Sequence, residues 1–241
     1  MSEQVKINVS PESILLKLDK VLLRTAKPGR YVGGEYNQVT KNWDDISTRV
    51  CLVFPDLYDL GISNLGLAIL YESINQRTDV LAERCYSPWL DMEEIMRQEA
   101  LPLYSLESKH ALLDFDIIGI TLPYETLYTN ALNILNLAGI PLKSSERTGD
   151  MPLIIAGGHA CYNPEPMAEF IDAFVIGEGE EVVHDIINIY QTWKAGGSDR
   201  SALLQQLSQI WGVYVPSLYQ AHYAADGTIS AFEALNPAVP A

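Results

Sequence analysis

The sequence has 241 residues, enough for one α/β domain with attached elements, and its 48% hydrophobic and 20% charged residues are typical of a globular protein with a core. The formal net charge is −15, from 31 acidic and 16 basic residues, and no cluster of Lys and Arg is present. Such a chain offers few cations to displace counterions from a nucleic acid, which argues against direct binding to DNA or RNA.

The first expected element is an amphipathic helix over residues 10–25. Ser10 is placed to cap it, Pro11 suits its first turn, and apolar side chains recur at helical spacing. A glycine-rich loop follows over 27–35. This loop either contacts a ligand or crosses the domain surface, and we favour the surface role.

From residue 49 the pattern alternates between strands and helices. The expected strands cover 50–54, 80–86, 115–121, 153–156 and 173–176. The expected helices cover 64–74, 89–98 and 123–139, and residues 177–193 are expected to hold a turn and a helix. Short apolar runs that alternate with helices predict a mostly parallel sheet with right-handed crossovers and helices on both faces. We therefore expect a flavodoxin-like, doubly wound α/β fold with five strands.

The pattern changes after Gly197. We expect a helix over 198–211 and a β-hairpin with strands at 213–219 and 222–232, turned at Asp226-Gly227. The predicted organisation is an N-terminal helix and loop (1–48), a Rossmann-type domain (49–197), and a helix and hairpin that lead out of it (198–241).

The apolar runs and the cysteines limit the possible environment and chemistry. The longest apolar runs are strand-sized, and the first residues lack the pattern of a signal peptide, so we expect a cytoplasmic protein without membrane contact. Cys51, Cys85 and Cys161 lie far apart and form no cluster motif, so we expect them to be buried as small apolar side chains. We assign no catalytic residue and no metal ligand.

Glycines and short polar residues recur where the expected strands end. The turn after the first strand reads Asp56-x-Tyr58-x-x-Gly61, followed by Ser63. Thr121-Leu122 ends the third strand, Gly157-Gly158-His159 ends the fourth, and Gly177-Glu178-Gly179 follows the fifth. Because parallel strands end at one edge of a sheet, these residues form a candidate ligand site there.

This ordered set resembles the cobalamin-binding domains found at the N-terminus of cobalamin-type radical-SAM proteins. Those domains carry D-x-H-x-x-G, S-x-L and G-G at corresponding positions, and the likeness covers about residues 27–235. The resemblance implies a cobalamin-binding-like module that positions cobalamin, or a substrate, for radical or methyl transfer. The catalytic core, with its iron–sulfur cluster and S-adenosylmethionine, would lie outside this sequence, in the same polypeptide or in a partner subunit. The cofactor-binding residues that the resemblance implies are Asp56, Tyr58, Gly61, Ser63, Thr121, Leu122, Gly157, Gly158, His159, Gly177, Glu178 and Gly179.

Several of these residues have an equally simple structural interpretation. Gly157-Gly158 either lets a bulky ligand approach the backbone or forms a tight turn. Thr121 either hydrogen-bonds a ligand or caps the next helix. Gly61 and Ser63 suit a turn and a helix cap as well as a site, and His159 either hydrogen-bonds a ligand or contacts a neighbouring domain.

Tyr58 departs from the family pattern, which has histidine as a cobalt ligand at this position. A neutral phenol with an ordinary pKa of about 10 is a poor substitute for imidazole. Two hypotheses follow: cobalamin binds without a protein ligand on its lower face, or the domain keeps the fold without the cofactor and serves as a docking or substrate-recognition module. We favour the first.

Overall fold

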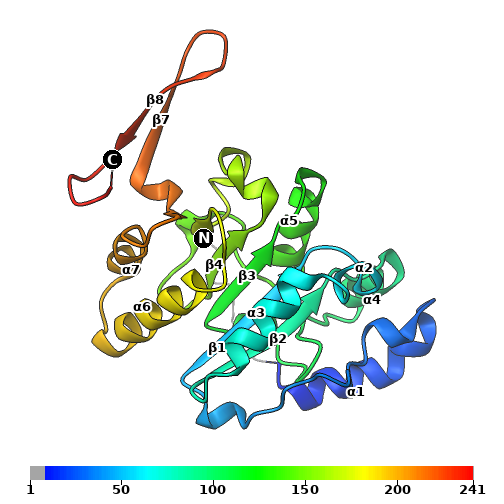
Figure 1. The fold of residues 1–241 in the computed structure, drawn as a ribbon. Helices are drawn as coiled ribbons and strands as arrows, with labels where there is room; N and C mark the ends of the chain where they lie inside the picture. Colours follow the sequence, from blue (N-terminus) through cyan, green and yellow to red (C-terminus); the bar gives the residue numbers. More distant parts are fainter. Residues whose placement is uncertain (1–8, 241) are drawn as a thin grey trace.

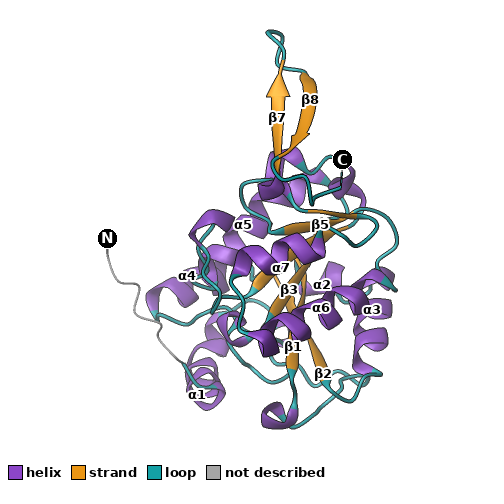
Figure 2. Ribbon diagram, turned by 90° about the vertical axis from the view of Figure 1, so that its left-hand side faces the viewer, coloured by secondary structure: helices purple, strands orange, loops and turns teal. Residues whose placement is uncertain are grey.

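The computed structural model describes residues 9–240, which form a six-stranded sheet between two layers of helices, with a separate hairpin projecting from the body (Figures 1 and 2). Residues 1–8, on which the expectation of no signal peptide depends, and residue 241 lie outside this description. No described helix combines the length and apolar character needed to cross a bilayer.

The sheet has the strand order β2-β1-β3-β4-β5-β6. Its strands are β1 (Thr48–Phe54), β2 (Val80–Tyr86), β3 (Ile117–Thr121), β4 (Leu153–Gly157), β5 (Ala173–Val175) and β6 (Val213–Tyr214). The first five strands pair in parallel, which confirms the predicted flavodoxin-like order. The sixth, β6, pairs antiparallel to β5 and was not predicted as part of this sheet.

Helices cover both faces of the sheet. They are α1 (Pro11–Val21), α2 (Tyr58–Gly61), α3 (Leu65–Asn75), α4 (Leu90–Gln98), α5 (Tyr128–Leu137), α6 (Val182–Gly196) and α7 (Arg200–Leu207). The Ser10 side chain caps α1, as predicted, and the Asn64 side chain caps α3 by accepting a hydrogen bond of 2.9 Å from the Leu67 N–H.

Alternating side chains of the strands form two separate hydrophobic cores. On β1, Cys51 and Val53 face the layer of α1, α4 and α5, whereas Val50 and Leu52 face α3, α6 and α7. Both α1 and α7 therefore share a core with the central sheet. All three cysteines are buried, as predicted.

The predicted hairpin strands are partly wrong. Pro216 lies inside the first predicted strand, and because proline cannot donate to a strand ladder, residues 213–219 do not form one strand. Val213 and Tyr214 join the main sheet instead. The hairpin consists of β7 (Tyr219–Tyr223) and β8 (Ile229–Ala234), with its turn at Asp226-Gly227 as predicted.

Two further boundaries differ from the prediction. The third strand begins at Ile117, and the carboxylate of Asp116, just before it, accepts a 2.8 Å hydrogen bond from the Arg49 N–H. The helix predicted over 198–211 covers Arg200–Leu207, with Asp199 as its cap.

Candidate functional site

The ends of β3, β4 and β5 bring together the residues predicted at the later strand ends. Thr121 and Gly157 are register partners, and Gly157 is also paired with Val175. The turn beginning at Gly177 follows directly, so three predicted segments meet at one edge of the sheet. This edge is where doubly wound folds bind their ligands.

Backbone contacts lock the β3 and β4 turns together. The Leu122 N–H donates to the Gly157 carbonyl at 2.7 Å, and the Leu122 carbonyl accepts from the Ala160 N–H at 3.0 Å. Gly158 has a φ of 112°, and a Cβ there would lie 2.6 Å from the Leu122 oxygen. The space in front of Gly158 is therefore filled by the chain itself, which favours the structural interpretation of the glycine pair.

Outside this lock the structure exposes polar and aromatic side chains. His159 is exposed and its ring lies 6.3 Å from that of Tyr162, which is 68% exposed. Tyr124, from the β3 turn, is also exposed. We call the exposed surface of Thr121, Tyr124, Gly158, His159, Tyr162, Gly177 and Glu178 the strand-end face.

The turn after β5 contributes mainly backbone groups to the strand-end face. Gly177 has a φ of 116°, which only glycine adopts readily, and open space surrounds the position of its missing Cβ. Glu178 is exposed. The Gly179 carbonyl accepts a hydrogen bond of 3.0 Å from the Val183 N–H and so begins α6.

The Asp56–Gly61 turn is held mainly by structural contacts. The Asp56 carboxylate accepts from the Leu57 N–H at 2.7 Å, and the Asp56 carbonyl accepts from the Ser87 N–H at 2.9 Å, which ties the end of β1 to the end of β2. A Cβ at Gly61 would lie 2.6 Å from the ring of Tyr86. The Ser63 hydroxyl donates to the Leu60 carbonyl at 3.3 Å.

Tyr58 packs toward β2, which neighbours β1 on the side away from β3 and β4. Its ring packs edge-on against Tyr86, at the end of β2, with ring centroids 5.5 Å apart. Its hydroxyl donates to the carboxylate of Glu35, in the glycine-rich loop. Burial, followed by this hydrogen bond, raises the pKa of Tyr58 to about 12, so its hydroxyl stays protonated at neutral pH.

Two positively charged side chains of the glycine-rich loop form ion pairs with the same turn, and we call these pairs the clamp. Lys27 Nζ lies 3.0 Å from the Asp59 carboxylate, and Arg30 also pairs with Asp59. These hydrogen bonds, that of Arg30 foremost, lower the pKa of Asp59 to about 2. Sequence reasoning missed this clamp. The opposite charges are visible in the sequence, but their pairing depends on how two distant segments fold together.

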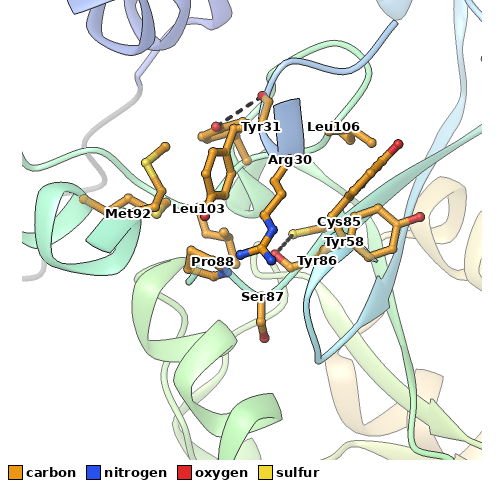
Figure 3. Close-up of a pocket in the computed structure, with 12 residues that line it drawn as sticks. Arg30, Tyr31, Tyr58, Cys85, Tyr86, Ser87, Pro88, Met92, Leu103 and Leu106 are labelled. Atoms are coloured by element: carbon orange, nitrogen blue, oxygen red, sulfur yellow. Dashed lines mark hydrogen bonds between the residues drawn. The ribbon is translucent and has the colours of Figure 1, made fainter. Parts of the chain in front are cut away.

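A small cavity lies beside Tyr58. It is lined by residues of the glycine-rich loop, the β1 turn, the end of β2 and the α4 layer, and Arg30, Tyr31, Tyr58 and Tyr86 are among them (Figure 3). Its volume is about 30 Å³. Because one water needs roughly 10–15 Å³ by such a measure, the cavity has room for about two or three waters.

These observations test whether the residues fit the cobalamin that the resemblance implies. Tyr58 is engaged by Glu35 and Tyr86, the space at Gly158 is filled by Leu122, and the cavity beside Tyr58 is far smaller than a nucleotide base. In this arrangement the residues do not form a pocket for the nucleotide tail of a corrinoid. The structure thus gathers the predicted residues of β3, β4 and β5 but separates Tyr58 from them.

Comparison with known proteins identifies the family. Residues 66–216, more than half of the chain, match the family described as "Radical SAM proteins, N-terminal". An uncharacterised protein of Methanocaldococcus jannaschii, MJ0966, is 28% identical over 143 residues, which are 58% of this chain and 26% of that relative. The chain thus matches about a quarter of the relative's length, and no solved structure matches it. The chain belongs to the family of N-terminal domains of radical-SAM proteins.

Proposed function

We propose that this chain is a docking module of a radical-SAM enzyme, which places its strand-end face against the catalytic core and helps to position the substrate there. The family places the chain at the N-terminal side of radical-SAM proteins. The core would supply the iron–sulfur cluster and S-adenosylmethionine, either in the same polypeptide or as a partner subunit.

The observation that carries the proposal is the close contact between the β3 and β4 turns at Leu122 and Gly158 (the Leu122–Gly158 lock), which is surrounded by exposed side chains. A ligand pocket at the ends of β3 and β4 needs a hollow between their turns, whereas here these two turns are joined by backbone hydrogen bonds. Aromatic side chains held on a rigid backbone lose little entropy on binding, and they are enriched at protein interfaces. Tyr124, His159 and Tyr162 therefore form a surface suited to a partner.

The cofactor hypothesis makes a different prediction, and one experiment separates the two. The chain is mixed with hydroxocobalamin at micromolar concentration, its visible spectrum is recorded, and the mixture is passed through gel filtration. We expect an unchanged cobalamin spectrum and no co-elution. Co-elution with a shifted spectrum would restore cobalamin binding at the strand ends and contradict a cofactor-free docking module.

Docking itself is tested by hydrogen exchange in the assembled enzyme, meaning this chain together with its radical-SAM core. We expect the amides of residues 121, 122, 124–126 and 158–163 to exchange more slowly in the assembly than in the chain alone. Tyr162→Ala should weaken this protection. Tyr36→Ala, which removes a fully exposed tyrosine of the glycine-rich loop, is the matched control and should not. Equal exchange rates in both states would contradict docking through this face.

A further inference from the structure

The hairpin formed by β7 and β8 has one apolar and one polar face. Across its ladder Tyr219 lies opposite Ala234 and Ala221 lies opposite Phe232, and beyond a bulge Tyr223 lies opposite Ile229. Because successive side chains of a strand alternate between faces, Tyr219, Ala221 and Tyr223 share one face with their partners Phe232 and Ala234. The bulge shifts the register by one residue, so that Ile229 is paired with Tyr223 on this face. We call it the apolar face of the hairpin.

The other face is polar. Gln220 lies opposite Glu233 and His222 opposite Ala231, and the His222 ring nitrogen lies 3.2 Å from the Glu233 carboxylate. A strand pattern with one apolar and one polar face normally marks a sheet that packs on one side. Among the residues that the structure describes, the apolar face of this hairpin packs on the body only at its base.

Within residues 9–240, the contacts between the hairpin and the body lie at the base of the hairpin. The ring of Tyr214, in β6, lies 5.4 Å from Tyr219 and 6.3 Å from Phe232. Residues 222–233 are all exposed, and the hairpin projects from the body in both ribbon views (Figures 1 and 2). A two-stranded hairpin of this kind is marginally stable in water, so a partner that covers its apolar face would stabilise it.

A hollow at the base continues the apolar face toward the body. It measures about 560 Å³ and is lined by Ile176, Trp211, Gly212, Val213, Tyr214, Tyr219, Phe232 and Ala234. Trp211 is 96% exposed, which is unusual for the largest apolar side chain. Ile176 directly precedes Gly177 of the strand-end face, so the hollow borders the surface assigned to the core.

From these contacts we infer that the apolar face of the hairpin and the hollow at Trp211 form a second contact area for the radical-SAM core. This inference rests on the proposed function. Two features favour the core as occupant: the hollow adjoins the strand-end face, and about three quarters of the matched relative lies outside the matched segment. The core would present an apolar surface to this area, since its lining is apolar and aromatic.

Hydrogen exchange of the assembled enzyme tests the inference. We expect the amides of residues 219–223 and 229–234 to exchange about tenfold or more slowly in the assembly than in the chain alone, because docking closes the local opening of the hairpin. Trp211→Glu and Phe232→Glu should each return these rates toward those of the chain alone. Trp211 lies outside the hairpin, so its variant keeps the test valid even if Phe232→Glu unfolds the hairpin.

The matched control is Ala231→Glu, which adds the same charge to the polar face and should leave the protection unchanged. Protection of residues 158–163 without protection of the hairpin would overturn the inference and leave the proposed function intact. Protection of neither segment would overturn both. In the chain alone, slower exchange of the hairpin amides at higher protein concentration, together with a dimer mass by light scattering, would show that a second copy covers the apolar face. That result would overturn the inference.

Discussion

At the residue scale, Gly157 and Gly158 are adjacent in sequence but differ in whether a side chain could replace the glycine hydrogen. Gly158 has positive φ and faces the Leu122 oxygen, whereas a Cβ at Gly157 would meet Val175 at an ordinary 3.8 Å. Alanine at 158 would therefore strain the backbone and push the two turns apart, while alanine at 157 would fit.

We predict that Gly158→Ala lowers the free energy of unfolding by about 2–4 kcal/mol, and that Gly157→Ala changes it by less than about 1 kcal/mol. Urea denaturation of the two variants measures both values. Similar losses in the two variants would show that the Leu122–Gly158 lock does not form, and would remove the main support for a filled site.

The candidate site also shows where residue-level reasoning from sequence fails. The spacing of Asp56, Tyr58 and Gly61 correctly predicted a turn at the end of β1. It did not predict the direction of the Tyr58 side chain, because that direction is set by Glu35 and Tyr86. These two residues are 23 and 28 positions away, and nothing in the local pattern links them to Tyr58.

At the element scale, Asp172 connects β4, α7 and the loop that precedes β4. Its carboxylate accepts from the Ile154 N–H at 2.8 Å, lies 3.0 Å from Arg147 and lies 2.8 Å from Arg200, all with little exposure to solvent. Burial lowers the pKa of Arg147, although the carboxylate of Asp172 opposes this effect. Removing the single negative charge would leave two shielded guanidinium groups without compensation.

We predict that Asp172→Asn lowers the free energy of unfolding by about 3–5 kcal/mol, because it removes the negative charge that pairs with the shielded guanidinium groups of Arg147 and Arg200. The control is Glu169→Gln, which removes the exposed pair of Lys143 and Glu169 at 3.1 Å and should cost less than about 1 kcal/mol. Both are measured by denaturant unfolding at neutral pH. A loss of unfolding free energy for Asp172→Asn as small as that for Glu169→Gln would contradict a stabilising role of Asp172 between Arg147 and Arg200.

At the scale of the whole molecule, the structure divides into a packed body and a projecting hairpin. Strands β3 and β4 lie in the middle of the sheet between two helical layers, and side chains such as Ile118 and Ile154 are fully buried. In the chain alone, the hairpin has only its own ladder and the contacts at its base. The two parts should therefore open independently.

We predict that native-state hydrogen exchange of the chain alone separates these parts. The amides of Ile118 and Ile154 should exchange only through global unfolding, with a strong dependence on denaturant. The amides of His222 and Ala231 should exchange through local opening, with almost no such dependence. A single exchange free energy for body and hairpin would show that the hairpin is part of one cooperative unit.

The sequence by itself determined the order and type of the elements. All five predicted strands of the sheet agree with the structure to within two residues at each end, and the flavodoxin-like order, the cap at Ser10 and the turn at Asp226-Gly227 were predicted correctly. Apolar runs, caps and turn residues act over a few neighbouring positions, so their effect is readable in the chain. The tertiary structure alone decided that Leu122 fills the space at Gly158, that Glu35 and Tyr86 hold Tyr58 away from β3 and β4, and that β6 joins the sheet. These features depend on contacts between segments far apart in sequence, whose approach is set by the packing of the whole sheet and its helices.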